Sequence, residues 1–147
     1  MSDAKIDPTV LKQAFGDAAV RDPHAATREE SYRAMVGFVP PRVRTRFAVS
    51  GAIDPTLLSL QEATRAHAFD TPLFDEKTKQ LMVFGIMLGQ LNDAAQMHAL
   101  AARKAGATWE ELHAVIALCY TFRGVPAANR GAEMLANVAM QEAKAAS

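Results

Sequence analysis

His98 is the residue of this chain best suited to chemistry. It stands in the alanine-rich stretch QMHALAARKAG, whose spacing predicts a helix that ends at Gly106. An imidazole can donate, accept or titrate near neutral pH, which suits a general acid or base. The alternative interpretation is a hydrogen-bonded histidine inside a helical core, and the surrounding residues leave both interpretations open.

Cys119 is the only cysteine in the chain, so no disulfide can form within one chain. Its neighbours one helical turn away are Val115, Ile116 and Phe122, and this apolar setting would raise the pKa of the thiol. We therefore predict a packed core cysteine rather than a nucleophile. A single cysteine also fits a reducing cytoplasm, where we expect the protein, and the N-terminal sequence shows no apolar signal core.

A carboxylate-binding site is a second possibility, at the end of the helix that contains Cys119. Arg123 precedes Gly124 and a helix that Pro126 is expected to begin, where free N–H groups favour an anion. Tyr120 offers a phenol at the same turn. The alternative is that Arg123 is a surface cation, stabilised by the dipole of the preceding helix.

Several other functions are excluded by what the sequence lacks. We predict no metal and no cofactor, because His, Asp and Glu show no ligand spacing and there is no P-loop, dinucleotide fingerprint or GxSxG motif. Lys plus Arg and Asp plus Glu number 16 each, without a basic patch, which argues against a nucleic-acid partner. The longest apolar stretches are shorter than the roughly 20 residues that span a bilayer.

Helical spacing between regular turn signals runs through the whole chain, and no segment alternates as a strand would. We predict a single all-α domain over 1–147 with about seven helices, of which 7–70 form the N-terminal part and 75–140 the core. Leu81 to Leu88 is apolar on nearly every face, which indicates burial both within the subunit and in an oligomer contact.

Capping signals place the helix boundaries. Asp7-Pro8 and Asp54-Pro55 combine an N-cap aspartate with proline at the first helical position, and Asp75 begins the next helix. Asn92 or Asp93 caps the helix of His98. Capping boxes are predicted at Thr27 with Glu30 and at Thr108 with Glu111. The helix that follows Pro40-Pro41 is expected to end near Gly51.

The segment HALAARKAGATWEEL, followed by GVPAAN, resembles the carboxymuconolactone decarboxylase family, which includes the alkyl hydroperoxidase D (AhpD) type of peroxidase. Those peroxidases carry a CxxCxxxH motif. Counting back from His98, the two cysteine positions fall on Ala94 and Leu91. The resemblance therefore implies an AhpD-like helical domain with a central antiparallel helix pair, from which the redox cysteines are missing.

The same resemblance implies roles for other residues. Gln80 takes the position of the glutamate that completes the proton relay of the peroxidases. The decarboxylases often read ExxxHxxAxxxG followed by YxGxPAAN, and here Ala94 replaces the glutamate and Phe122 the tyrosine. The predicted catalytic residues are His98 and Gln80. The predicted substrate-binding residues are Arg123 and Tyr120, from the turn described above, and Asn129 of the GVPAAN segment. The resemblance also implies a homo-oligomer, a trimer or a hexamer.

Three hypotheses follow. The first is a cofactor-free enzyme of the carboxymuconolactone decarboxylase type, acting on a small carboxylic acid or lactone, with His98 as acid or base. The second is a peroxidase that uses Cys119 between subunits, which the missing CxxC disfavours. The third is a catalytically inactive domain that binds a ligand or supports assembly. Burial separates them: an open cavity beside His98 and Gln80 favours chemistry or binding, and sealed side chains favour the third hypothesis.

Overall fold

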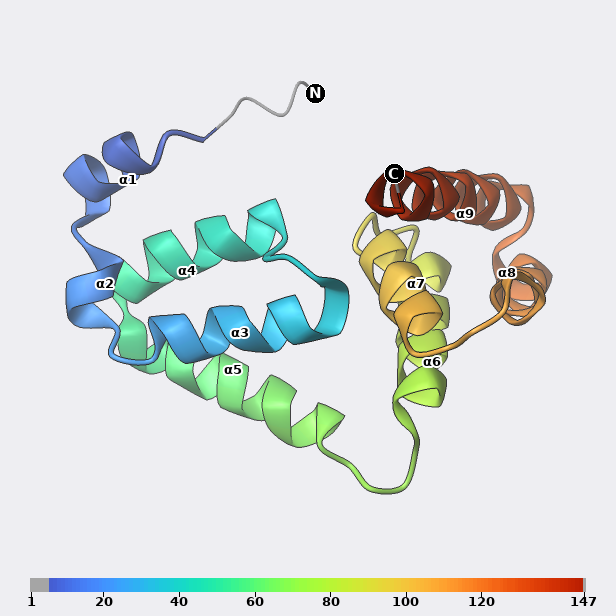
Figure 1. Cartoon of the computed structure of the whole chain (residues 1–147), viewed down its shortest axis with the longest axis horizontal. Coiled ribbons are helices and arrows are strands. Elements are labelled where there is room, and N and C mark those ends of the chain that lie inside the picture. The colour runs from blue at the N-terminus through green and yellow to red at the C-terminus, as the bar shows by residue number, and fades with distance from the viewer. Residues whose placement is uncertain (1–5, 147) are drawn as a thin grey trace. The chain divides into compact units, whose positions relative to one another are not determined.

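The computed structural model describes residues 6–146, which contain nine α-helices and no strand (Figure 1). The all-α, AhpD-like prediction is confirmed, although the described helices outnumber the seven or so expected. One reason is α2 (Ala18–Arg21), whose four residues are too few to show a helical period. The chain divides into two compact units, with the boundary between Thr71 and Pro72. Whether 1–147 behaves as one domain stays a prediction.

The first unit centres on α4. Its helices are α1 (Pro8–Phe15), α2 (Ala18–Arg21), α3 (Ala25–Val36), α4 (Pro41–Ile53) and α5 (Pro55–Phe69), and α4 packs against the other four. Tyr32, Phe47 and Leu58 form the core, and the rings of Tyr32 and Phe47 meet edge to face with centroids 5.7 Å apart. Glu62 is buried beside them and is paired with Arg46 and Arg65, so its charge is compensated.

The predicted capping box of Thr27 and Glu30 is wrong, because α3 already begins at Ala25. The start of this helix is set by Asp22, whose carboxylate accepts a hydrogen bond from the backbone N–H of His24 at 3.0 Å. The same carboxylate forms a buried ion pair with Arg28. A tertiary ion pair thus fixes a boundary that the local pattern placed elsewhere.

The predicted stop at Gly51 is also wrong, because α4 continues to Ile53. A Cβ at Gly51 would lie only 3.2 Å from the Cβ of Ala18. The glycine therefore allows α2 to pack closely on α4, and its absence of a side chain is a packing feature rather than a helix end.

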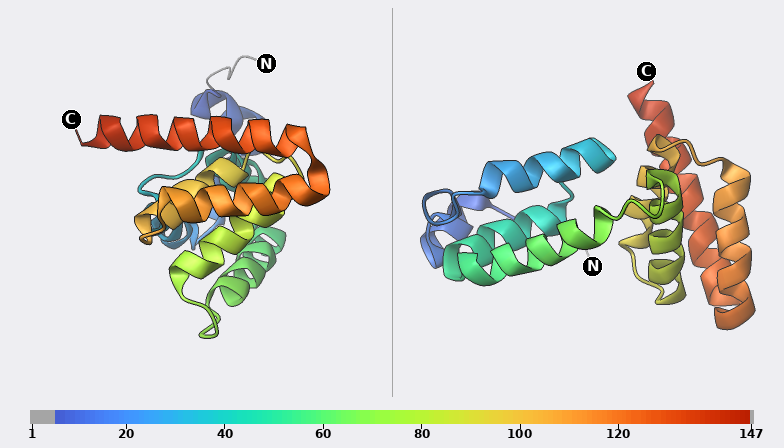
Figure 2. Two further views of the ribbon diagram at one scale, coloured as in Figure 1. Left: turned by 90° about the vertical axis from the view of Figure 1, so that its right-hand side faces the viewer. Right: turned by 90° about the horizontal axis from the view of Figure 1, so that it is seen from below.

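The second unit contains α6 (Glu76–Gly89), α7 (Ala95–Lys104), α8 (Trp109–Arg123) and α9 (Val125–Ala145). The α6 and α7 helices lie side by side in opposite directions, as predicted for the central pair (Figures 1 and 2). The α6 helix also packs against α8, and α9 packs on both α7 and α8.

The predicted caps of both units are largely confirmed. Asp7, Asp54 and Asp75 each accept a hydrogen bond from a backbone N–H in the first turn of the helix that follows. Thr108 and Glu111 form the reciprocal capping box at the start of α8. These signals act between neighbours in the sequence, so the sequence alone is enough to place them.

Two faces of neighbouring helices position the residues of interest. One face of α6 is buried and consists of Gln80, Phe84 and Leu88, spaced four residues apart. The facing side of α7 consists of small residues, and Ala95, Ala99 and Ala102 are all fully buried. Short side chains let the two helices approach closely, so that a polar side chain on α6 can reach one on α7.

Candidate functional site

His98 and Gln80 are brought together across the α6–α7 pair, as the resemblance implied. The Nδ1 atom of His98 lies 2.8 Å from Oε1 of Gln80. Gln80 is fully buried, and only 7% of His98 is exposed. A buried polar pair of this kind is stable only when its members are hydrogen-bonded to each other or to further groups.

Glu76 extends this pair by one turn of α6 and was not predicted. The Nε2 atom of Gln80 donates to Oε1 of Glu76 at 2.6 Å, and Nζ of Lys79 lies 3.1 Å from Oε2 of Glu76. Burial alone would raise the pKa of Glu76. The hydrogen bonds from Gln80 and Lys79 and the charge of Lys79 outweigh burial, so that this pKa lies below its usual value. The i,i+4 spacing to Gln80 was a signal in the sequence that could have identified Glu76.

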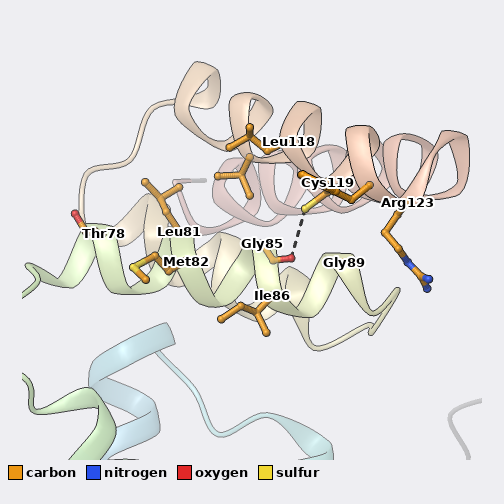
Figure 3. Close-up of a pocket in the computed structure, with 11 residues that line it drawn as sticks. Thr78, Leu81, Met82, Gly85, Ile86, Gly89, Leu118, Cys119 and Arg123 are labelled. Carbon is orange, nitrogen blue, oxygen red and sulfur yellow. Dashed lines mark hydrogen bonds between the residues drawn. The ribbon is translucent and has the colours of Figure 1, made fainter.

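A separate pocket lies between α6 and α8 (Figure 3). Its volume is about 460 Å³, within the range of small-molecule sites. The lining is almost entirely apolar and is formed by Thr78, Leu81, Met82, Gly85, Ile86, Gly89, Val115, Leu118, Cys119, Phe122 and Arg123. Neither His98 nor Gln80 lines it, so the space for a ligand and the predicted catalytic pair lie in different places.

Cys119 sits in this pocket, where its Sγ donates a weak hydrogen bond to the carbonyl of Gly85 at 3.4 Å (Figure 3). The thiol is partly buried, and burial raises its pKa. The raised pKa agrees with the prediction from the apolar neighbours, but the thiol lines a pocket and is not packed in the core as predicted. The thiol is accordingly a poor nucleophile at neutral pH.

The positions that hold cysteines in AhpD-type relatives lie between α6 and α7. Leu91 adopts a left-handed backbone with φ of 56° in the turn after α6, and Ala94 directly precedes α7. Asp93, the acidic neighbour of Ala94, forms an ion pair with Arg130 of α9. The carboxylate of Asp93 is therefore paired with a side chain of α9.

The three predicted substrate-binding residues are all exposed, whereas His98 is almost fully buried. Arg123 borders the α6–α8 pocket, and Figure 3 shows its guanidinium beyond Gly89, directed away from the pocket. Tyr120 on α8 is 51% exposed and does not line the pocket. Asn129 lies on the first turns of α9. Their roles in binding a substrate stay predictions.

Among residues 6–146, no group of three or more His, Cys, Asp or Glu side chains is placed to hold a metal ion. In the same residues, no helix is both long and apolar enough to cross a membrane.

Comparison with known proteins gives one result. Residues 55–137, more than half of the chain, match the family described as the carboxymuconolactone decarboxylase family. The match runs from α5 through α8 and into α9, and it includes Glu76, Gln80 and His98. Neither the curated proteins nor the solved structures contain a match to the chain.

Proposed function

Because the chain belongs to the carboxymuconolactone decarboxylase family, we propose that it is a cofactor-free enzyme that acts on a small carboxylic acid or lactone. In this proposal His98 is the general base, which takes a proton from the substrate and returns it as the conjugate acid. Gln80 holds the imidazole in place through a neutral hydrogen bond.

The observation that supports this proposal is the bond between His98 Nδ1 and Gln80 Oε1. A carbonyl oxygen only accepts, so Nδ1 must carry the hydrogen. In a neutral imidazole the lone pair then lies on Nε2, the nitrogen directed away from Gln80. A histidine held in one tautomer by a neighbouring group is the arrangement that general bases require.

Gln80 differs from a carboxylate partner in one respect. An amide does not take up a proton near neutral pH, so it can orient the imidazole but cannot receive its proton. A neutral partner also stabilises the imidazolium less than a carboxylate would. We therefore expect His98 to favour chemistry that needs a weak base, such as proton transfer next to an activated carbonyl.

The experiment compares turnover of a panel of lactones, β-keto acids and small carboxylic acids by the native protein and by His98→Ala. We expect the variant to lose turnover while keeping its helical content and oligomeric state. His113→Ala is the matched control, because His113 is an exposed histidine on α8 and should leave the rate unchanged. An unchanged rate in His98→Ala would exclude His98 as the catalyst.

A second candidate is a domain that binds a small apolar ligand without turning it over. It is favoured by the burial of Gln80 and His98 and by the position of the apolar pocket on the other side of α6. Tight binding of a panel compound, with no turnover of any compound and chemical shift changes confined to α6 and α8, would favour this candidate. A peroxidase is the weakest candidate, because the described residues contain one thiol and its pKa is raised.

We also propose that the protein forms a trimer or hexamer in the cytoplasm. The support is the apolar surface of α6 and α8, where Met82, Ile86 and Phe122 are 48%, 58% and 86% exposed. Apolar groups gathered in this way mark a surface that another chain or a ligand covers. Light scattering of the native protein tests the oligomeric state, and a monomer at micromolar concentration would contradict it.

A further inference from the structure

A carboxylate stands one helical turn before Gln80, on the side of the amide that faces away from His98. Glu76 is in the first turn of α6, and half of its side chain (52%) is exposed. The hydrogen bonds Glu76–Gln80 and Gln80–His98, at 2.6 and 2.8 Å, form one continuous polar chain from the surface to the buried imidazole. The amide of Gln80 stands between the carboxylate and the imidazole, and it has one donor end and one acceptor end.

The amide of Gln80 can present either its oxygen or its NH₂ group to His98. If Gln80 presents its oxygen, Nδ1 of the imidazole must donate, and the lone pair lies on Nε2. If the amide is turned over, its NH₂ group faces His98, Nδ1 must accept, and the hydrogen moves to Nε2. The orientation of this buried amide therefore decides whether Nδ1 of the proposed base donates or accepts in its bond with Gln80.

An ionised carboxylate removes this choice, because it can only accept hydrogen bonds. With Glu76 at 2.6 Å, the NH₂ group of Gln80 must face Glu76, and the oxygen must face His98. Charge-assisted bonds of this length are stronger than bonds between neutral groups. The low pKa of Glu76 keeps the carboxylate ionised throughout the neutral range.

We infer that Glu76 is a positioning residue, which acts through Gln80 to hold His98 in the Nδ1–H tautomer with its basic lone pair on Nε2. The catalytic meaning of this inference rests on the proposed function of His98. The two hydrogen bonds orient the imidazole without conducting protons, because the amide of Gln80 between them keeps its own hydrogens. Lys79, whose ammonium lies 3.1 Å from Glu76, is the charged partner of this carboxylate.

A purely structural role for Glu76 has to be separated from this one. An acidic residue in the first turn also stabilises a helix through its dipole, and Glu76 with Lys79 forms an i,i+3 ion pair. Neither effect depends on the tautomer of His98. Glu110 offers a matched control, because it is likewise an exposed acid in the first turn of its helix, and that helix is α8 rather than α6 or α7.

The experiment reads the tautomer directly. Protein labelled with ¹⁵N at histidine is studied by two-bond ¹H–¹⁵N correlation spectra at pH 8, where an ordinary histidine is neutral. In the native protein we expect the Nδ1–H form of His98 to dominate by about tenfold or more, the scale that a hydrogen bond to a charged group supplies. His98→Ala assigns the signal.

Glu76→Gln has nearly the same shape, but an amide at position 76 can either donate or accept. Both orientations of Gln80 then keep a partner, and we expect the preference to fall below about threefold. Glu76→Ala should give a mixture for a different reason, since no acceptor remains. Glu110→Gln should leave the native preference unchanged. An Nε2–H form in the native protein, or native preferences in both Glu76 variants, would overturn the inference.

The same variants distinguish this inference from the proposed function. If the tautomer of His98 changes in the Glu76 variants but the native protein turns over no panel compound, the positioning role of Glu76 stands and the catalytic role of His98 is removed. If His98→Ala loses turnover but the Glu76 variants keep the native tautomer, the catalytic role of His98 stands and the positioning role of Glu76 is removed. Where turnover is found, Glu76→Gln should lower kcat more than it changes KM, because the fraction of correctly protonated base falls.

Discussion

The α6 helix has two faces of opposite character: one carries the hydrogen-bonded partner of His98, and the other lines an apolar pocket. On one face, Gln80 is fully buried and links Glu76 to His98. On the other, Met82 and Gly89 lie about 160–180° from Gln80 around the helix axis at 3.6 residues per turn. That second face lines the apolar pocket that contains Cys119.

The comparison shows why membership of the family does not decide the activity. The buried face of α6 holds the hydrogen-bonded partner of His98 but offers little exposed surface, whereas the apolar face has a pocket of about 460 Å³ with one weakly nucleophilic thiol. A catalyst needs both properties in one place, but a ligand-binding domain needs only the pocket. Variants that alter one face at a time therefore separate the two candidate functions.

The largest effect is expected when the buried amide of Gln80 is replaced by an apolar side chain. Gln80→Leu removes the partner of His98 Nδ1 in a buried position, and an unsatisfied buried donor costs about 1–3 kcal/mol. Glu76 contributes little to this cost, because half of its side chain is exposed and can bind water. Urea unfolding, followed by circular dichroism, measures the loss.

The neighbouring residue provides the reciprocal control. Leu81→Gln exchanges the same two residue types on the pocket face, where Leu81 is only partly buried. Water can reach a polar group there, so we expect a loss of no more than about 1 kcal/mol, a fraction of that for a fully buried leucine. Equal losses in the two variants would show that the two faces do not differ as described.

The sequence was sufficient where structure depends on near neighbours. The caps at Asp7, Asp54 and Asp75 and the capping box at Thr108 join groups two to three residues apart, and all of them form. The family resemblance added the contact between Gln80 and His98, which are 18 residues apart and which no local pattern connects. The family and the all-α fold are confirmed on this basis.

The sequence was insufficient where one helix meets another. The start of α3 depends on the ion pair between Asp22 and Arg28, and the length of α4 depends on the approach of α2 to Gly51. The pocket depends on how α6 and α8 pack around Gly85, so its separation from His98 could not be read from spacing. Glu76 was visible in principle, since an i,i+4 partner needs only the helix itself.

A smaller effect is expected when the apolar pocket is narrowed without changing its polarity. A Cβ added at Gly85 would lie 3.1 Å from Cγ1 of Val115, inside the pocket. We expect native protein to bind the fluorescent anion 1-anilinonaphthalene-8-sulfonate there, and Gly85→Ala to weaken this binding by about tenfold, the scale of one methylene in an apolar pocket. Fluorescence titration of the folded proteins gives both dissociation constants.

Gly89→Ala is the matched control for the narrowed pocket. Gly89 borders the same pocket, but a Cβ there has no atom within 4 Å. Both substitutions add the same single methyl group to α6, but only the one at Gly85 meets a pocket side chain, so a difference in dye binding reports the pocket itself. Unchanged binding in Gly85→Ala would place the dye elsewhere. His98 should keep its tautomer in both variants, because they alter only the pocket face.

The smallest effect concerns Cys119, whose thiol we expect to react more slowly than the thiol of an unstructured peptide. Burial raises the pKa of this thiol, so at pH 7 less of it is thiolate than in an unstructured peptide. Alkylation by iodoacetamide should therefore be slower than for a free cysteine, and its rate should continue to rise above the pH at which the peptide reaches its plateau. Cys119→Ser supplies the blank. Alkylation at pH 7 that is faster than in the peptide would mean that the pocket activates the thiol. The pocket would then contain a reactive nucleophile, and peroxide reduction by Cys119 between subunits would become a serious candidate.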